Sequence, residues 1–312
     1  MLTIVIDKEI PYLESCVREC WPEVQVRALD GKAINTEAVR DAEVLVVRTR
    51  TRVDERLLDG SRVQLVCTAT IGYDHIDMVY CDRVGVKWSS CPGCNAQAVC
   101  DYIEEVLDEV SGGKGPLSIG VVGVGHVGSK VADMAARRGM KVLLNDPPKG
   151  LGVSLDVIAR ECDIVTFHTP LSQGGAYPTW HLCNKAFLEQ TKQEVLIINS
   201  ARGGVVDEKA LMESGRRFVL DTWEGEPTIN AEMVRKAELA SMHIAGYSLE
   251  GKRNATQMCL DRIAEEFGLR KIVVPAEEAN GDSAKGWIGR ISEQLKQAPE
   301  QFESLRKAYR YR

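Results

Sequence analysis

The sequence predicts an α/β protein with two doubly wound parallel-sheet domains. Two observations carry this prediction. Short runs rich in Val and Ile alternate with longer helix-compatible segments, which is the pattern of βαβ units. This alternation stops once, at Ser-Gly-Gly-Lys-Gly-Pro (residues 111–116), and then starts again. With 312 residues, the chain is long enough for two domains with separate cores.

The first domain is predicted over residues 1–95. Its strands are the apolar runs at residues 2–6, 24–26, 44–47, 63–68 and 84–88. Helix-compatible segments between them cover residues 10–20, 36–40 and 55–58. Because helical crossovers join parallel strands, this order predicts a parallel sheet with helices on both faces.

The second domain is predicted over residues 96–248, beginning with a helix at residues 96–110. Its strands are expected at residues 117–122, 141–145, 163–167, 194–199, 218–220 and 242–245. Helices are expected between them at residues 127–138, 155–161, 185–189, 208–213 and 231–237. This is a second βα series, and it predicts a second doubly wound sheet.

The remaining chain is predicted to return to the first domain and then to end in a short segment. Residues 249–269 contain a helical pattern at 251–267 that would cross back to the first domain. Residues 270–312 are charged and irregular, with a further helix predicted at residues 292–309.

The composition excludes several classes of partner. The net charge of −6 gives no reason to expect binding to nucleic acid or to an anionic membrane. No apolar run approaches the roughly 18 residues of a membrane span, and the first residues have the pattern of a strand. We therefore expect a cytoplasmic protein whose ten cysteines are mostly buried thiols.

One pair of cysteines, Cys91 and Cys94, has a spacing that invites a redox or zinc interpretation. The alternative is a turn shaped by the Pro and Gly between them. Because no second Cys or His pair follows at zinc-finger spacing, no metal site is expected.

A glycine-rich turn, Gly123-Val-Gly125-His126-Val127-Gly128, separates the strand at 117–122 from the following helix. The first glycine permits a tight turn, the second lets a pyrophosphate approach the backbone, and the third lets the helix pack closely. On its own this pattern also fits a tight turn in any α/β protein. The flanking strand and helix favour a dinucleotide site, and hence a Rossmann domain at residues 96–248 beside a flavodoxin-like substrate domain at residues 1–95.

Asp146 directly follows the next predicted strand, about 20 residues after the glycine turn, where an acidic residue binds the ribose hydroxyls. Its charge would repel a 2′-phosphate, and no Arg follows it directly. The predicted coenzyme is therefore NAD rather than NADP.

Three charged or titratable residues lie at or just beyond predicted strands: Arg202, Glu226 and His243. An imidazole can take the proton of a substrate hydroxyl, a carboxylate can orient that imidazole, and an arginine can hold a substrate carboxylate. The alternatives are a surface arginine, a helix-starting glutamate and a packed core histidine. Their common position at strand ends, where α/β folds place their sites, favours a catalytic set.

The chain resembles the D-isomer-specific 2-hydroxyacid dehydrogenases over about residues 1–265. The matching segments are residues 47–49, 68–77, 92–96, 120–128, 146–148, 167–171, 199–203, 221–227 and 243–251. The motifs at residues 92–96, 223–227 and 243–247 look specific to the subgroup that oxidises 4-phospho-D-erythronate to 2-oxo-3-hydroxy-4-phosphobutanoate, a step of pyridoxal 5′-phosphate biosynthesis.

The resemblance also implies roles for particular residues. Arg202 and Glu226 would be active-site residues and His243 the proton donor and acceptor. The residues implied to contact NAD are Asp146, Thr169, Asp221 and Gly246, and those implied to contact substrate are Thr49, Thr70 and Tyr247. Independently, Arg48, Arg50 and Arg52 offer positive charge for a phosphate, although Arg50 and Arg52 also fit a solvated basic edge.

Two other functions stay open at the level of sequence. One is a dehydrogenase for another 2-hydroxy acid, such as phosphoglycerate or glycerate. The other is an NAD-responsive binding protein without turnover, which would be favoured if any of the three catalytic residues were replaced. Many members of the family that the chain resembles carry a longer C-terminal dimerisation domain, of which residues 270–312 would be a reduced form, so a homodimer is also left open.

Overall fold

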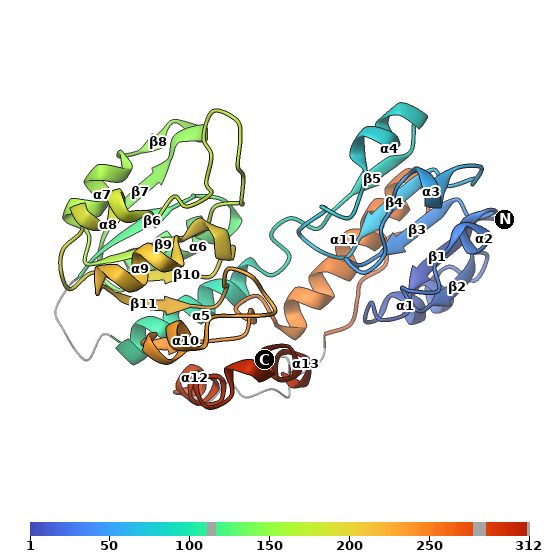
Figure 1. Ribbon diagram of the computed structural model, residues 1–312. Helices are drawn as coiled ribbons and strands as arrows, with labels where there is room; N and C mark the ends of the chain where they lie inside the picture. Colours follow the sequence, from blue (N-terminus) through green and yellow to red (C-terminus); the bar gives the residue numbers. More distant parts are fainter. Residues whose placement is uncertain (111–116, 277–284, 311–312) are drawn as a thin grey trace. The chain divides into compact units, whose positions relative to one another are not determined.

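The structure is a computed structural model that describes residues 1–110, 117–276 and 285–310 (Figure 1). The chain divides into two compact units. The first comprises Met1–Asn95 with Ser248–Ala279, and the second comprises Ala96–Tyr247 with Asn280–Arg312. Each unit is an α/β fold with its own sheet, which confirms the predicted fold class.

The sheet of the first unit has five parallel strands in the order β2-β1-β3-β4-β5. They are β1 (Thr3–Asp7), β2 (Gln25–Leu29), β3 (Val44–Val47), β4 (Leu65–Thr68) and β5 (Lys87–Ser89). The helices of this unit are α1 (Leu13–Cys20), α2 (Thr36–Val39), α3 (Glu55–Leu58), α4 (Met78–Val84) and α11 (Leu249–Phe267).

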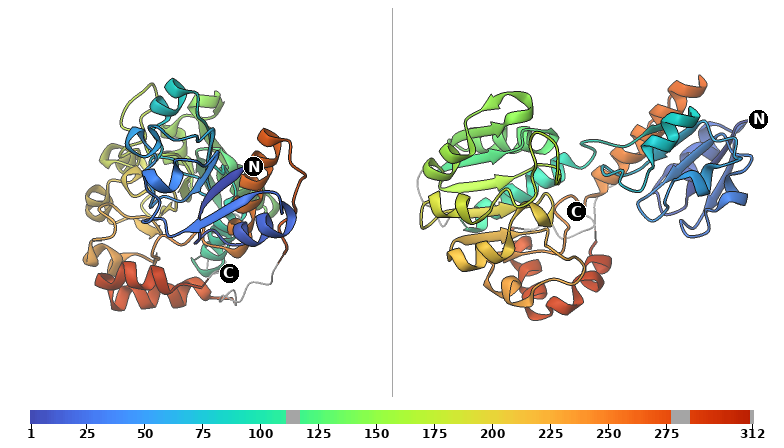
Figure 2. Two further views of the ribbon diagram at one scale, coloured as in Figure 1. Left: turned by 90° about the vertical axis from the view of Figure 1, so that its right-hand side faces the viewer. Right: turned by 45° about the horizontal axis from the view of Figure 1, so that its top comes forward.

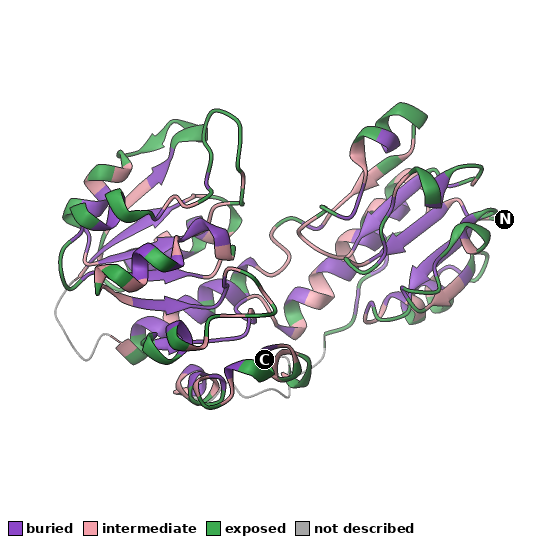
Figure 3. Cartoon of the chain, viewed as in Figure 1, coloured by how far each residue is buried: buried purple, intermediate pink, exposed green. Residues whose placement is uncertain are grey.

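The first unit has two hydrophobic cores, which the alternating side chains of its strands supply. In β1, Ile4 and Ile6 belong to the core that also contains buried residues of α11, whereas Val5 belongs to the other core. This period of two follows from strand geometry, and the result is a sheet buried on both faces. Figure 3 shows β1, β3 and β4, whose residues are all buried, in the colour of buried residues.

The sheet of the second unit has seven strands in the order β12-β11-β10-β9-β6-β7-β8. They are β6 (Ser118–Val122), β7 (Lys141–Asp146), β8 (Leu151–Gly152), β9 (Ile164–Phe167), β10 (Leu196–Asn199), β11 (Arg217–Leu220) and β12 (Leu239–Ala240). Between neighbouring β6 and β9 the chain switches from one half of the sheet to the other. Such switch points are where α/β sheets bind ligands.

Eight helices accompany this sheet in the part of the chain that the structure describes. They are α5 (Ala96–Val110), α6 (His126–Arg137), α7 (Leu155–Glu161), α8 (Lys185–Gln190), α9 (Glu208–Ser214), α10 (Ala231–Lys236), α12 (Trp287–Gln297) and α13 (Phe302–Ala308). The C-terminal α12 packs on the edge strand β12, and α13 follows it (Figure 2, red). None of the described helices is long and apolar enough to cross a membrane.

The structure differs from the prediction in several places. The sheet of the second unit is not wholly parallel, since β8 pairs antiparallel with β7. Only residues 147–150 join these strands, which is too short for a crossover helix, so the chain turns back on itself.

The strand predicted at residues 242–245 is also wrong. The last strand is β12, at Leu239–Ala240, and residue His243 has a φ of 58° in the loop that follows. The helix predicted at residues 292–309 is interrupted, because Pro299 has no backbone N–H for a continuing helix. The chain forms α12 and α13 instead.

Candidate active site

A cavity of about 800 Å³ opens at the ends of β6, β7 and β9 in the second unit. Its wall includes Gly123, Gly125, Asp146 and Thr169 from the predicted coenzyme-binding set. The cavity therefore lies at the switch point of the sheet, where a dinucleotide is expected.

The glycines of the turn are required by close backbone contacts. Gly123 has a φ of 88°, and a Cβ at Gly128 would lie 1.9 Å from the carbonyl oxygen of Gly123. At Gly125, in contrast, a Cβ would meet no described protein atom within 4 Å. The first and third glycines thus shape the turn as predicted, and the second leaves space beside the backbone. His126 and Val127 start α6 and, like Gly128, are not part of the described cavity wall.

Asp146 is buried at the end of β7, and its Oδ2 accepts a 2.9 Å hydrogen bond from the backbone N–H of Val124. Lys149 was not predicted to contribute. Its Nζ donates to the carbonyl oxygen of Val124 at 2.6 Å and lies 3.8 Å from Asp146 Oδ2. A carboxylate and an ammonium group therefore flank the glycine turn.

The hydroxyl of Thr169 gives a direct test of whether this cavity fits a ligand. Its Oγ1 is buried and has no hydrogen-bond partner among the described residues. Because buried hydroxyls are normally paired, an orphaned one in a cavity wall indicates a missing polar ligand. The orphaned hydroxyl, the open space at Gly125 and the acid at Asp146 together fit NAD.

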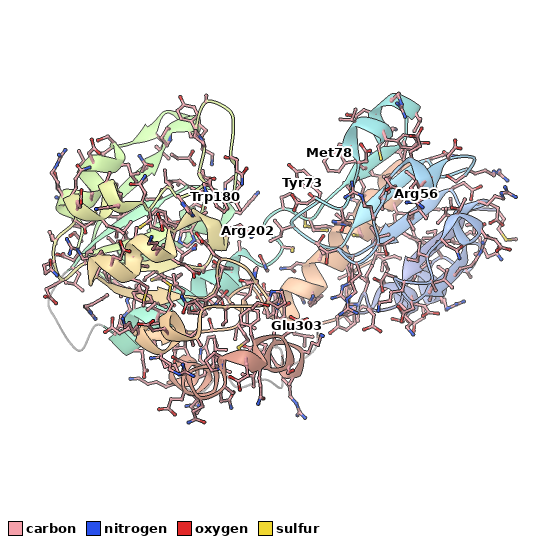
Figure 4. The ribbon with its side chains drawn as sticks, in the orientation of Figure 1. Arg56, Tyr73, Met78, Trp180, Arg202 and Glu303 are labelled. Atoms are coloured by element: carbon pink, nitrogen blue, oxygen red, sulfur yellow. The ribbon has the colours of Figure 1, made fainter. Side chains whose placement is uncertain are left out.

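A second cavity, of about 250 Å³, contains all three residues of the predicted catalytic set. Arg202 follows β10, Glu226 follows β11, and His243 follows β12, which are neighbouring strands. The structure thus brings together side chains that are separated by up to 41 positions in the sequence. Figure 4 labels Arg202 and Trp180, which lie next to each other on this unit and both line the cavity.

His243 and Glu226 form a hydrogen-bonded pair, with Nδ1 of the imidazole 2.8 Å from Oε2 of the carboxylate. The other carboxylate oxygen, Oε1, accepts a 2.9 Å bond from the backbone N–H of Trp223. Because a carboxylate accepts hydrogen bonds, Nδ1 is assigned the proton. This tautomer leaves the lone pair on Nε2, which is the arrangement needed for a general base.

The loop that carries His243 is held by Asp221. The buried Asp221 carboxylate accepts bonds from the backbone N–H groups of Ile244 at 2.8 Å and Ala245 at 3.0 Å, and from Ser241 Oγ at 2.6 Å. The N–H of His243 donates to the Asp221 carbonyl oxygen at 2.8 Å. Asp221 and Gly246 were predicted to contact NAD, but neither belongs to the described wall of the coenzyme cavity.

Arg202 is exposed in the catalytic cavity and donates from Nη1 to the carbonyl oxygen of Ala201 at 2.8 Å. The next residue, Gly203, packs against the turn that carries Glu226. A Cβ there would lie 2.0 Å from the carbonyl oxygen of Trp223, so only glycine fits. The loops of Arg202 and Glu226 are therefore interlocked.

Two side chains around this cavity were not predicted from the sequence. Trp180 stacks on His181 with ring centroids 4.6 Å apart, and His181 Nε2 lies 2.6 Å from Glu224 Oε1. Glu208, the first residue of α9, accepts a bond from the backbone N–H of Glu224. Neither Trp180 nor Glu208 stands at a spacing that signals chemistry, because only tertiary packing brings them to the site.

The predicted substrate-binding residues lie on both units, and each unit is described by itself. In the first unit, Arg48 and Thr49 follow β3, and Thr70 follows the neighbouring β4. Thr70 Oγ1 donates to the carbonyl oxygen of Gly72 at 2.9 Å. In the second unit, the hydroxyl of Tyr247 accepts a 3.1 Å bond from Nε of Arg306 in α13.

Cys91 and Cys94 belong to the first unit. Cys91 is buried, with its Sγ 3.7 Å from Cys259 Sγ, and burial raises the pKa of the Cys94 thiol to about 12. In the described ranges, no group of three His, Cys, Asp or Glu side chains is placed to hold a metal ion.

Comparison with known proteins identifies the family. Residues 113–247 match the model of the D-isomer specific 2-hydroxyacid dehydrogenase, NAD binding domain. The chain is 40% identical to the erythronate-4-phosphate dehydrogenase of Bacteroides fragilis over 335 aligned positions, covering 99% of this chain and 96% of the relative. Identity to the enzyme of the same name from Pseudomonas putida is 39%, covering 88% of this chain and 76% of that one.

Solved structures share the fold at lower identity. The cofactor-bound 3-phosphoglycerate dehydrogenase of Entamoeba histolytica matches with a TM-score of 0.69 and 23% identity, covering 89% of this chain and 99% of that one. The D-lactate dehydrogenase of Aquifex aeolicus, complexed with NAD and lactic acid, matches with a TM-score of 0.64 and 22% identity, covering 88% and 100%. On the strength of its near-full-length relatives, this chain belongs to the erythronate-4-phosphate dehydrogenase family of D-isomer-specific 2-hydroxyacid dehydrogenases.

Proposed function

We propose that the protein oxidises 4-phospho-D-erythronate to 2-oxo-3-hydroxy-4-phosphobutanoate with NAD, as a step of pyridoxal 5′-phosphate biosynthesis. Relatives that are 40% and 39% identical to the chain carry the name of that dehydrogenase. The observation that carries the proposal is the His243–Glu226 hydrogen bond in a cavity that also contains Arg202. These are the groups that oxidation of a 2-hydroxy acid requires.

The coenzyme and catalytic cavities are connected by one short segment of chain. Pro170 and Ser172 line the coenzyme cavity, and Leu171 between them lines the catalytic cavity. We propose that the glycine turn and Asp146 hold the pyrophosphate and ribose of NAD, with Thr169 as a further polar contact. When bound, NAD supplies the acceptor for a hydride from C2 of the substrate.

Each residue of the catalytic cavity would have its own role in binding the substrate and moving its proton. Arg202 binds the substrate carboxylate and so fixes C2 and its hydroxyl. As the C2–H bond breaks and the C2=O bond forms, Nε2 of His243 takes the hydroxyl proton. Glu226 then stabilises the imidazolium through Nδ1. We propose that the remaining parts of the substrate are bound by Thr49, Thr70, Tyr247 and Arg48.

A steady-state assay with purified protein, NAD and 4-phospho-D-erythronate tests the proposal by following the absorbance of reduced nicotinamide. Hydrazine should be present to trap the 2-oxo product and draw the reaction forward. The same assay with 3-phosphoglycerate serves as the comparison. We expect preferential turnover of the four-carbon acid. No reduction of NAD, or equal turnover of both acids, would contradict the assignment.

We also propose that the enzyme acts in the cytoplasm, where its cysteines, all unpaired in the described structure, stay reduced. A homodimer is proposed as its assembly. Sedimentation equilibrium at several protein concentrations measures the assembly directly, and a monomer at all of them would exclude the dimer.

A further inference from the structure

Glu208 is a buried carboxyl group that the mechanism above does not use. It starts α9, and only 8% of the residue is exposed. Its Oε1 accepts a 2.6 Å hydrogen bond from the backbone N–H of Glu224. Burial, with Glu224 and Glu226 nearby, raises the pKa of this carboxyl to about 7, although the bond from Glu224 opposes the rise. Carboxyl groups are rarely buried this deeply unless they have a hydrogen-bond or ion-pair partner.

The bond joins α9, which follows the loop of Arg202, to the turn that carries Glu226. Glu208 follows Arg202 by six positions, and Glu224 precedes Glu226 by two. In the turn between β11 and α10, the N–H of Trp223 donates to Glu226 and the N–H of Glu224 donates to Glu208. Two carboxylates therefore hold two consecutive amides of the same turn.

The outer side of that turn is held as well. The Glu224 side chain lies 2.6 Å from His181 Nε2, and His181 Nδ1 lies 3.7 Å from Asp207 Oδ2. A glutamate in the first turn of a helix ordinarily stabilises that helix through its dipole. Here the side chain bonds to an amide of another loop, which the dipole effect does not require.

We infer that Glu208 is a positioning residue for the catalytic pair: by holding the amide of Glu224, it fixes the turn so that Glu226 reaches Nδ1 of His243. This inference rests on the proposed function. Above pH 7, where Glu208 is ionised, its 2.6 Å bond from the Glu224 amide is charge-assisted. At that pH a neutral acceptor holds the turn less firmly than the carboxylate, and a side chain without an acceptor does not hold it.

The test compares Glu208→Gln, Glu208→Ala and the control Glu213→Gln, which changes an exposed glutamate on the same helix. With 4-phospho-D-erythronate, we expect kcat to fall about twofold to threefold for Gln and about tenfold or more for Ala, since a lost buried hydrogen bond leaves an amide unpaired. Affinity for NADH, measured by fluorescence, should stay within about twofold in all variants, because the coenzyme cavity is a separate structure.

Repeating the two substitutions in a Glu226→Gln background distinguishes positioning from a general structural role. If Glu208 acts through Glu226, neither substitution lowers kcat further there, because coupled sites are not additive. Undiminished losses in that background, or near-normal kcat for Glu208→Ala, would overturn the inference. If Glu208→Ala does not fold, the Gln variant gives the same comparison. Absence of turnover in the unmutated protein would reject the proposed function instead, whatever the variants do.

Discussion

The coenzyme cavity and the catalytic cavity both lie at the strand ends of one sheet, but they are formed by different kinds of contact. The coenzyme cavity is shaped by backbone, with glycines at Gly123 and Gly128 that no other residue can replace without a clash. The catalytic cavity is held by side chains that bond to amides of distant segments, as Asp221 does to Ile244 and Glu208 does to Glu224. Dinucleotide binding therefore depends on a local turn, whereas acid–base chemistry depends on contacts between separate loops.

Removing the proton acceptor should separate the two cavities most clearly, because it should lower kcat without changing coenzyme affinity. His243→Ala is expected to lower kcat by about 10²–10⁴-fold, the usual contribution of a general acid–base group. Affinity for NADH should be nearly unchanged, since the imidazole does not line the coenzyme cavity. Steady-state rates and fluorescence titration measure the two effects. A variant with near-normal kcat would remove His243 from the mechanism, and a parallel loss of NADH affinity would show that the two sites are not separable.

The catalytic cavity should also carry a pH-dependent stability cost, owing to Glu208. Its pKa is raised from 4.5 to about 7 in the folded protein, so the folded state retains a proton that the unfolded state has lost. The cost is therefore absent below pH 4.5, where both states are protonated, and grows as the pH rises to about 7. Above that pH the folded protein has lost about 3 kcal/mol of stability through this group.

Urea unfolding of the unmutated protein and Glu208→Gln across this pH range tests that expectation. The variant does not titrate at this position, so its advantage in unfolding free energy should grow between pH 4.5 and 7 and level off above. A difference that is constant with pH would show that Glu208 does not titrate as described.

On the coenzyme side, Asp146→Ala should weaken NAD binding by about tenfold, as expected for loss of a charged hydrogen-bond acceptor. It should also narrow the preference over NADP, because Lys149, 3.8 Å from the carboxylate, would then be available to a 2′-phosphate. Titration with both coenzymes measures the two affinities. The double variant Asp146→Ala, Lys149→Ala should not show the narrowed preference, because the ammonium group that would bind the 2′-phosphate is gone. Unchanged affinities would show that Asp146 does not bind the ribose.

The smallest effect is expected where the catalytic region meets the C-terminal helix α13. Arg306 donates to the hydroxyl of Tyr247, and its guanidinium lies 5.5 Å from the centre of that ring. Arg306→Met should raise KM for 4-phospho-D-erythronate by about fivefold, the value of one such hydrogen bond, and leave KM for NAD unchanged. Lys307→Met, an exposed neighbour, is the control. Equal KM values in both variants would exclude Arg306 from substrate binding.

The same contrast explains what could be predicted from the sequence. The positions of the glycine turn and Asp146 could be predicted because a strand, a turn and a helix are specified by neighbouring residues. Arg202, Glu226 and His243 were predicted as a set from their positions at strand ends, but their hydrogen bonding could not be derived from chain order. The resemblance to a family supplied the substrate, which no spacing indicates.

Other features could not be predicted because they depend on packing between distant segments. The segment Met-His-Ile-Ala has a strand-like composition and predicts a strand, but in the structure it is a loop whose amides at Ile244 and Ala245 donate to the Asp221 carboxylate. Glu208 has the appearance of an ordinary helix start. Arg306 lies in a segment where the sequence predicts one long helix. Its contact with Tyr247 arises only from the tertiary fold.

The most direct test of the central claim is to follow the hydrogen on C2 of the substrate. The protein would be mixed with NAD and 4-phospho-D-erythronate carrying deuterium at C2, and the mass of the reduced coenzyme measured. Direct hydride transfer, with the hydroxyl proton going to His243, predicts reduced nicotinamide that carries the deuterium. Reduced nicotinamide without deuterium, or deuterium released to water, would contradict it.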